Sequence, residues 1–201
     1  MGAATTGLAH DDQPSSLGLG SIVDAAGRLV DAEGSEALTL TRVADQLGVT
    51  QPALYRYVDG RAGMWQALGL STRELLAERL ALASVGLSGS DAVVAIANAW
   101  RAFVHDHPGR YQSADRCAVS GDAQHEASVQ RTIEVLEQAL RGFALPPADL
   151  AHAAHTLRSA LHGFVSYELG HSNPASLDVD ESLGQLVHFL CASFQAKGNA
   201  S

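Results

Sequence analysis

The residues best suited to contact a partner lie in the stretch TRVADQLGVTQPALYRYVDGRAGM, residues 41–64. Leu54 and Val58 are four positions apart, so in a helix both point inward and their neighbours point outward. The candidates left for contact are Gln51, Pro52, Ala53, Tyr55, Arg56 and Tyr57. Glutamine can bond bidentately to adenine, arginine can bond guanine or a phosphate, and apolar carbons can touch a thymine methyl. These residue types fit a surface that contacts base edges.

A tight turn comes just before these residues. Thr39 can cap a first helix, and Ala44 is small enough for a second helix to approach it closely. Gly48 permits a sharp turn, Thr50 can cap the second helix, and Pro52 is tolerated in its first turn. Two helices joined by a short glycine-containing turn, the second presenting hydrogen-bonding side chains, form the helix-turn-helix arrangement.

The charge distribution is compatible with that arrangement. A net charge of −9 speaks against a general polyanion binder, because nonspecific affinity for nucleic acid comes from Lys and Arg. The acidity lies mostly elsewhere: residues 38–65 carry three arginines and two aspartates, whereas residues 84–201 carry seven basic and twelve acidic residues. Lys197 is the only lysine, so phosphate contacts near the stretch must come from arginines, hydroxyls and backbone amides.

Apolar residues recur at spacings of three and four almost throughout, which predicts an all-α fold. We expect a disordered arm over residues 1–17, a helix-turn-helix domain over 18–65 and a helical C-terminal domain over 66–201. A helix over 59–83 should connect the two domains. Further apolar faces predict helices around residues 22–30, 93–104, 129–140, 150–165 and 183–194. The sequence HPGRY at 107–111 and the prolines at 146 and 147 should each stop a helix.

The stretch LTLTRVADQLGVTQPALYRYVDGRAGMWQAL resembles the DNA-binding domain of TetR-family transcriptional regulators. The residues that carry the resemblance are Thr39 or Thr41, Val43 and Ala44, Gly48 and Val49, Thr50, Leu54 and Tyr55, Tyr57 and Arg61. Arg61 stands where the family more often has lysine. The resemblance adds Thr41, Arg42, Thr50 and Arg61 to the expected DNA contacts. It implies a homodimer that binds a palindromic operator on double-stranded DNA and is released by a small-molecule inducer, more often as a repressor.

The second half resembles the family only in outline. Its sequence LRSALHGFVSYELGH is similar to the Trp-His-Gly signature of one subclass, with Leu161 in the tryptophan position. The candidates for a ligand cavity are Trp100, Phe103, His107, Tyr111, Leu157, Leu161, His162 and Phe164. They would suit a mostly apolar molecule held by a few hydrogen bonds, although a stripe at helical spacing also fits plain core.

Apolar faces near 150–169 and 181–195 predict a four-helix bundle between two subunits, with Leu157, Leu186 and Leu190 at the interface.

Two other interpretations stay open at this point. The pairs His105/His107 and His152/His155 permit a metal-responsive regulator, but no further ligand follows at a helpful spacing, so no metal site is assigned. A ligand-binding protein of the same fold without DNA binding would show a decayed second helix, which is not seen.

The sequence has no G-x-S-x-G, no phosphate-binding glycine loop and no H-E-x-x-H, so we predict neither an enzyme nor a cofactor. Without a leader, an apolar span or paired cysteines, the chain is expected to be cytoplasmic and to have no membrane partner.

Overall fold

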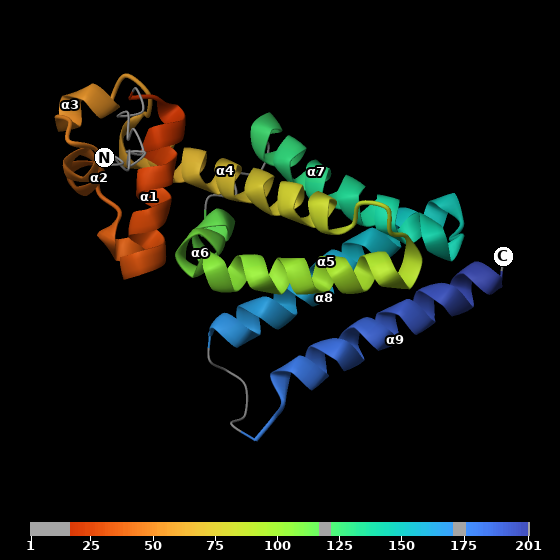
Figure 1. Cartoon of the computed structure of the whole chain (residues 1–201). Helices are drawn as coiled ribbons and strands as arrows, with labels where there is room; N and C mark the ends of the chain where they lie inside the picture. Colours follow the sequence, from red (N-terminus) through yellow and green to blue (C-terminus); the bar gives the residue numbers. More distant parts are fainter. Residues whose placement is uncertain (1–16, 117–121, 171–175, 201) are drawn as a thin grey trace, which may run out of the picture.

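The computed structural model describes residues 17–116, 122–170 and 176–200, so the arm expected over residues 1–17 lies outside this part except for its last residue. Every regular element in the described ranges is helical, which confirms the predicted all-α fold (Figure 1). The elements are α1 Leu19–Glu33, η1 Ser35–Ala37, α2 Leu40–Leu47, α3 Gln51–Leu54, α4 Gly60–Ala83, α5 Gly89–Asp106, α6 Pro108–Arg116, α7 Ala123–Leu140, η2 Arg141–Phe143, α8 Pro147–Leu169 and α9 Val179–Asn199. No described helix is both long and apolar enough to cross a bilayer.

The first three helices and the start of α4 enclose a small core at one end of the molecule (Figure 1). Ile22 of α1, Val43 of α2 and Leu54 of α3 are fully buried in it. Burying these side chains gives about 1.5–3 kcal/mol each. The short α3 could not stay folded alone, so this packing fixes its position.

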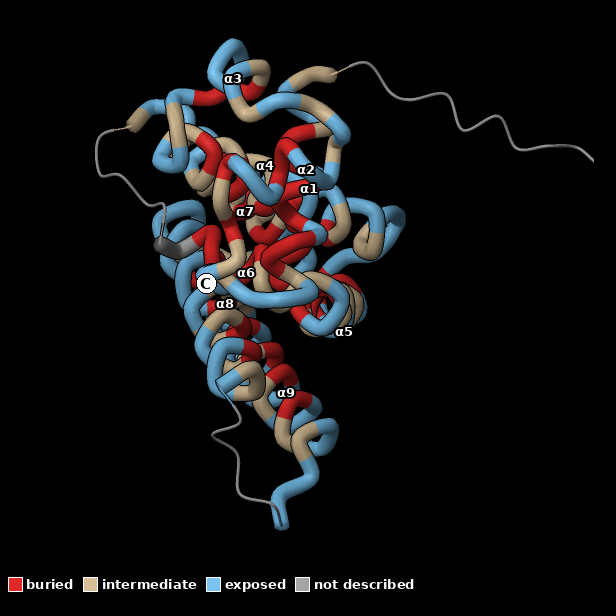
Figure 2. The backbone as a smooth tube through the Cα atoms, turned by 90° about the vertical axis from the view of Figure 1, so that its left-hand side faces the viewer, coloured by how far each residue is buried: buried red, intermediate tan, exposed pale blue. Residues whose placement is uncertain are grey.

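The rest of α4 and helices α5 to α9 enclose a second, larger core. Figure 2 shows the buried positions recurring along α8 and α9 on the side that meets the other helices. Helix α4 belongs to both units, since Leu68 is buried in the first core and Leu76 in the second. A continuous helix of 24 residues therefore links them. The division at residue 65 stays a prediction, because α4 runs through it without a break.

Helix α6 corrects the expectation for residues 107–111. The HPGRY segment does end α5, since His107 is the residue after its last turn, but Pro108 immediately begins a new helix. Proline suits the first helical position, where its missing N–H would have no partner in any case. The N–H of Tyr111 then donates to the carbonyl oxygen of His107 at 3.0 Å. A sequence that looks like a helix stop is here both a stop and a start.

Candidate DNA-binding surface and C-terminal cavity

Thr39 and Gly48 set the geometry of the turn between α2 and α3. The hydroxyl oxygen of Thr39 accepts a hydrogen bond from the backbone N–H of Arg42 at 3.2 Å, so the predicted cap is present. Gly48 has φ 67°, a left-handed conformation that disfavours other residues. Thr50 holds the cap position of α3, but its side chain makes no capping hydrogen bond. The turn geometry is thus the predicted one, except for this last bond.

The side chains of α3 and the turn after it divide as their spacing predicts. Leu54 and Val58 are buried, whereas Tyr55 is 55% exposed and Tyr57 40% exposed. The helix itself is only four residues long, so the tyrosines lie in the turn that follows it. All ten candidates for DNA contact reach the surface: Thr41, Arg42, Thr50, Pro52, Tyr55, Arg56, Tyr57 and Arg61 are exposed, and Gln51 and Ala53 are half-buried.

Gln51 is the centre of a short hydrogen-bond chain. The hydroxyl of Thr41 on α2 donates to Oε1 of Gln51 at 3.2 Å, and Nε2 of Gln51 donates to the hydroxyl of Tyr55 at 3.5 Å. An amide oxygen can accept two hydrogen bonds, so the bond from Thr41 leaves one lone pair for another donor. The chain orients the Gln51 amide at the surface before any partner arrives.

Arg42 forms an ion pair with Glu33, near the end of α1. The hydrogen bond from Arg42 lowers the pKa of the Glu33 carboxyl below its ordinary value and raises that of the guanidinium. Both side chains are about half exposed, so the pair is weak in water. A phosphate approaching Arg42 has to compete with this internal carboxylate.

A three-helix unit that buries its apolar positions and exposes hydrogen-bonding groups after a glycine turn defines the class of helix-turn-helix DNA-binding proteins. Residues 22–68 match the family described as "Bacterial regulatory proteins, tetR family". Residues 93–190 match "Tetracyclin repressor-like, C-terminal domain". The chain belongs to the TetR family of transcriptional regulators, whose members are not enzymes.

Individual relatives agree with this assignment. The chain is 32% identical over 158 residues to "Uncharacterized HTH-type transcriptional regulator Rv0681" of Mycobacterium tuberculosis, covering 78% of this chain and 72% of the relative. Over 45 residues it is 49% identical to "HTH-type transcriptional repressor DrrR1" of Streptomyces coeruleorubidus, covering 22% of this chain and 17% of that one. Among solved structures, the TetR regulator SCO7222 of Streptomyces coelicolor superposes with a TM-score of 0.75 at 18% identity, covering 90% of this chain and 99% of that one. At this low identity the likeness shows the fold alone.

A small cavity of about 30 Å³ lies in the second core, between helices α4 to α8. Leu76, Trp100 and Val129 form its apolar wall. The polar lining residues are Thr72, Arg73, Tyr111, Thr132, Arg158 and His162. The indole N–H of Trp100 donates to the hydroxyl of Tyr111 at 3.0 Å, and that hydroxyl lies 2.7 Å from Nδ1 of His162.

The structure brings together only some of the residues expected to bind a ligand. Trp100, Tyr111 and His162 line the cavity. Of the other candidates, Phe103, Leu157 and Leu161 are buried in the surrounding core, and Phe164 packs against it. His107 does not line this cavity, since its Nδ1 lies 3.3 Å from a carboxylate oxygen of Asp31 on α1. Thr72, Thr132 and Arg158 also line the cavity, although no local sequence pattern marks them.

The candidate dimer surface needs one correction. Leu157 is fully buried inside the protomer and therefore offers nothing to a partner subunit. Leu186 and Leu190 are partly exposed on α9, and the aromatic side chains nearby are more exposed still: Tyr167 on α8 at 64% and Phe189 on α9 at 66%. Both helices thus present apolar side chains at the surface of the protomer.

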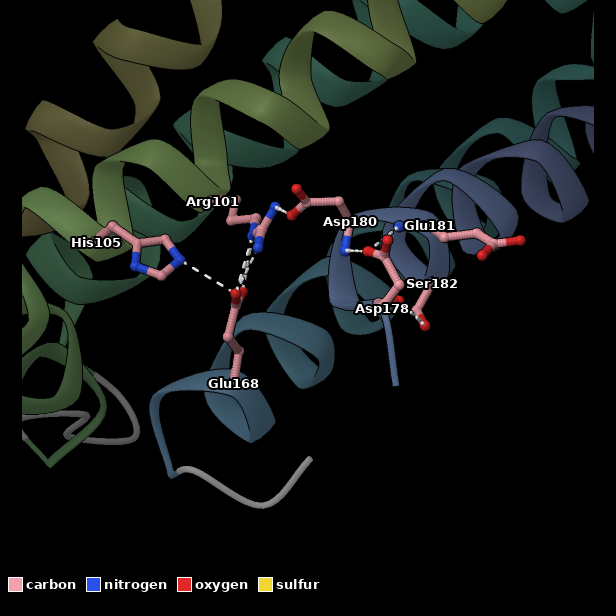
Figure 3. Close-up of polar contacts among 7 residues, drawn as sticks. All are labelled: Arg101, His105, Glu168, Asp178, Asp180, Glu181 and Ser182. Atoms are coloured by element: carbon pink, nitrogen blue, oxygen red, sulfur yellow. Dashed lines mark hydrogen bonds and ion pairs between the residues drawn. The ribbon is translucent and has the colours of Figure 1, made fainter. Parts of the chain in front are cut away.

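An ion-pair network ties the ends of three helices together (Figure 3). Arg101 of α5 donates from Nε and Nη2 to the carboxylate of Glu168 on α8, at 2.9 and 2.7 Å, and from Nη1 to Asp180 on α9 at 2.6 Å. Nε2 of His105 lies 3.2 Å from the same carboxylate of Glu168. Asp178 begins α9 by accepting hydrogen bonds from the backbone N–H groups of residues 180 and 181. The network holds α8 and α9 in place against α5.

The histidine pairs considered for metal binding do not gather further ligands. His152 and His155 are both exposed on α8. His105 contacts Glu168, whereas His107 contacts Asp31. In the ranges that the structure describes, no three His, Cys, Asp or Glu side chains are arranged to hold a metal ion.

Proposed function

We propose that this TetR-family regulator is a cytoplasmic homodimer that binds a palindromic operator and is released from it by a small, mostly apolar molecule. Repression is the proposed sign, and the relative DrrR1, which is described as a repressor, supports it over a short match. The observation that carries the DNA-binding part is the amide of Gln51, which hydrogen bonds orient at the surface beside the exposed Tyr55, while Leu54 is buried.

The proposed DNA contacts fall into two groups. Gln51, with Pro52 and Ala53 beside it, would enter the major groove and contact base edges. Backbone phosphates would be bound by the remaining exposed candidates, which are Thr41, Arg42, Thr50, Tyr55, Arg56, Tyr57 and Arg61. Thr41 would serve both groups, because its hydroxyl already bonds the Gln51 amide.

A contact between α1 and α6 supports the proposed response to a ligand. The backbone N–H and Nε of Arg110 donate to the two carboxylate oxygens of Asp31, both at 2.9 Å. The guanidinium fills the space beside Gly27, where a Cβ atom would lie 2.1 Å from it. The next residue, Tyr111, reaches the opposite way into the cavity. A ligand that displaced Tyr111 would shift α6 and hence α1, lowering operator affinity by its differential binding to the two states.

The experiment that tests this function is operator selection from randomised duplexes with the purified protein. Two half-sites related by two-fold symmetry are expected, about one helical turn apart. Gln51→Ala should relax preference at one base position and cost about 1–3 kcal/mol there, whereas Arg61→Ala should weaken all sequences alike. If no duplex were enriched, the proposed operator binding would be wrong. If Gln51→Ala left every base preference unchanged, the proposed base contact by Gln51 would be wrong.

Two other functions compete with this one. A metal-responsive regulator would use His152 and His155, and their double substitution by alanine would abolish a metal-dependent change in operator binding. A non-enzymatic ligand-binding protein of the same fold would bind small molecules but select no operator. The half-buried Gln51 amide, oriented at the surface by hydrogen bonds, favours the DNA-binding regulator over both.

A further inference from the structure

The hydrogen bonds around the C-terminal cavity account for most of its polar groups. Thr72 donates its hydroxyl proton to the carbonyl oxygen of Leu68 at 2.7 Å. Arg73 donates to the hydroxyl of Ser128 at 2.8 Å and to the carbonyl oxygen of Ala114 at 2.7 Å. Since an indole N–H can only donate, Tyr111 accepts from Trp100, which leaves its own proton for His162.

Two polar groups in the cavity wall, those of Thr132 and Arg158, have no hydrogen-bond partner among the described residues. Among the residues described here, none forms a hydrogen bond or ion pair with the guanidinium of Arg158 or with the hydroxyl of Thr132. Thr132 is buried and Arg158 partly buried. Neither group belongs to the fully enclosed polar atoms that lack a partner, so both remain accessible to a molecule entering the cavity. The wall thus offers donors that no described residue of the protein uses.

The charged residues that line the cavity are all basic. Its lining includes two arginines and no Asp or Glu. By contrast, Arg101 and Arg110 in the same unit each lie against a carboxylate. A guanidinium matches a carboxylate in geometry as well as in charge, because two parallel N–H groups face two oxygens. An anion with oxygen acceptors would match the charge and the donors of this cavity.

We propose that the cavity binds the carboxylate of a small organic acid, with Arg158 as its counter-ion and the Thr132 hydroxyl as a second donor. This inference rests on the proposed ligand response and names the chemical class of the ligand. The acid's carbon body lies against Leu76, Trp100 and Val129, in keeping with a mostly apolar molecule. A volume of about 30 Å³ holds roughly two water molecules, so the carboxylate fits but a larger body must widen the cavity. Tyr111 belongs to the wall, so this widening moves α6.

The two tryptophans of the chain provide a direct test. Trp100 reports on the cavity, and Trp65 on α4 lies against the other core and serves as an internal control. The indole N–H resonances of ¹⁵N-labelled full-length protein are followed while sodium propionate or sodium benzoate is added at constant ionic strength. The neutral amides, propionamide and benzamide, are the matched probes. The acids should shift the Trp100 resonance saturably and leave Trp65 unmoved, and the amides should shift neither.

Substitutions then assign the binding to Arg158. Arg158→Met should weaken acid binding at least about tenfold, since a charge-assisted bidentate pair is lost, and Arg158→Gln serves if the Met variant fails to fold. Arg131→Met, which removes an exposed arginine of α7, is the control and should bind the acids normally. The proposal is overturned if neither acid moves Trp100, if acid and amide act equally, or if the Arg158 variants bind as the wild type does.

The outcome is separable from that of the proposed function. Operator selection with no enriched duplex, together with acid binding at Trp100, would leave this site intact and remove the DNA-binding role. An enriched palindrome with an unresponsive Trp100 resonance would do the reverse.

Discussion

At the scale of single residues, the surface around α3 is organised by hydrogen bonds within the protein. Thr41 holds the amide of Gln51, and Glu33 holds the guanidinium of Arg42. The two contacts differ in their consequence for DNA binding. The bond from Thr41 orients a group that still has donors and a lone pair to offer, whereas the ion pair occupies the charge that a phosphate would need.

Glu33→Gln is therefore expected to strengthen operator binding, because the phosphate no longer competes with an internal carboxylate. The gain should be modest, up to about fivefold, since an exposed ion pair contributes little. Fluorescence anisotropy with a labelled operator, measured over a range of salt concentrations, gives the affinities. Glu36→Gln removes an equal charge from an exposed position that does not contact Arg42, and so separates local competition from general electrostatics. Equal gains in the two variants would contradict the local explanation.

At the scale of elements, α6 has neighbouring residues with different partners. Arg110 is 7% exposed and donates a hydrogen bond to Asp31 of α1, whereas the hydroxyl of Tyr111 accepts one from Trp100 in the second core. The backbone of Gly109 lies so close to α1 that a Cβ atom there would be 2.0 Å from the carbonyl oxygen of Val30. Such a tight fit means that α6 cannot move without moving α1 or breaking this contact.

A double-mutant cycle on Asp31 and Arg110 measures that coupling. Arg110→Met and Asp31→Asn should each destabilise the protein by roughly 3 kcal/mol, because each breaks a largely buried ion pair. In the Met variant the Asp31 carboxylate keeps only His107 and the backbone N–H of residue 110 as partners. The double variant should cost clearly less than the sum. Arg79→Met is the control, since its pair with Asp106 is exposed and should cost under about 1 kcal/mol. Additive effects in chemical denaturation would show that the contact does not couple α1 to α6.

How much of this could be predicted depends on where the determining contacts lie. The turn at Gly48 and the inward pair of Leu54 and Val58 follow from neighbouring residues, so the sequence predicts them correctly. The cavity wall joins Thr132 of α7 to Arg158 of α8 by tertiary packing, which leaves no periodic trace in the sequence. Leu157 was misplaced for a related reason: an apolar stripe indicates burial but not whether the cover is the same chain or a second copy.

The Arg101 network predicts how stability depends on pH. The hydrogen bonds that Arg101 donates to Glu168 hold the pKa of the Glu168 carboxyl below its ordinary value of 4.5. A carboxyl with a lowered folded pKa stabilises the native state above its unfolded pKa, and this contribution is lost as the pH falls through the folded pKa. Urea denaturation at pH 7 should therefore show Glu168→Gln to be less stable by roughly 1–2 kcal/mol. The difference should shrink below pH 4.5, and a constant difference down to pH 3 would contradict the ion-pair explanation.

At the scale of the whole molecule, the helix-turn-helix unit determines how many copies an operator needs, and the second unit offers a surface through which two copies could pair. One helix-turn-helix unit can occupy only one half-site, so a palindromic operator requires two copies at a fixed spacing. Helices α8 and α9 lie on the side of the molecule away from α3 (Figure 1), and they carry the exposed side chains of Tyr167 and Phe189. Pairing these helices with those of a second copy would bury the apolar groups and leave both α3 segments free for DNA.

The corresponding prediction is that the protein sediments as a dimer at micromolar concentration and that Phe189→Asp converts it to a folded monomer. A charge placed at a desolvated, self-complementary interface meets its own copy, so repulsion adds to the lost apolar burial. Leu82→Asp is the matched control, because Leu82 is even more exposed, at 75%, but lies at the end of α4. It should remain a dimer and bind the full palindrome as the wild type does. Leu157→Asp should unfold the protein instead, since its side chain lies in the protomer core. A Phe189→Asp protein that stayed dimeric and bound the palindrome tightly would place the subunit contact on another face.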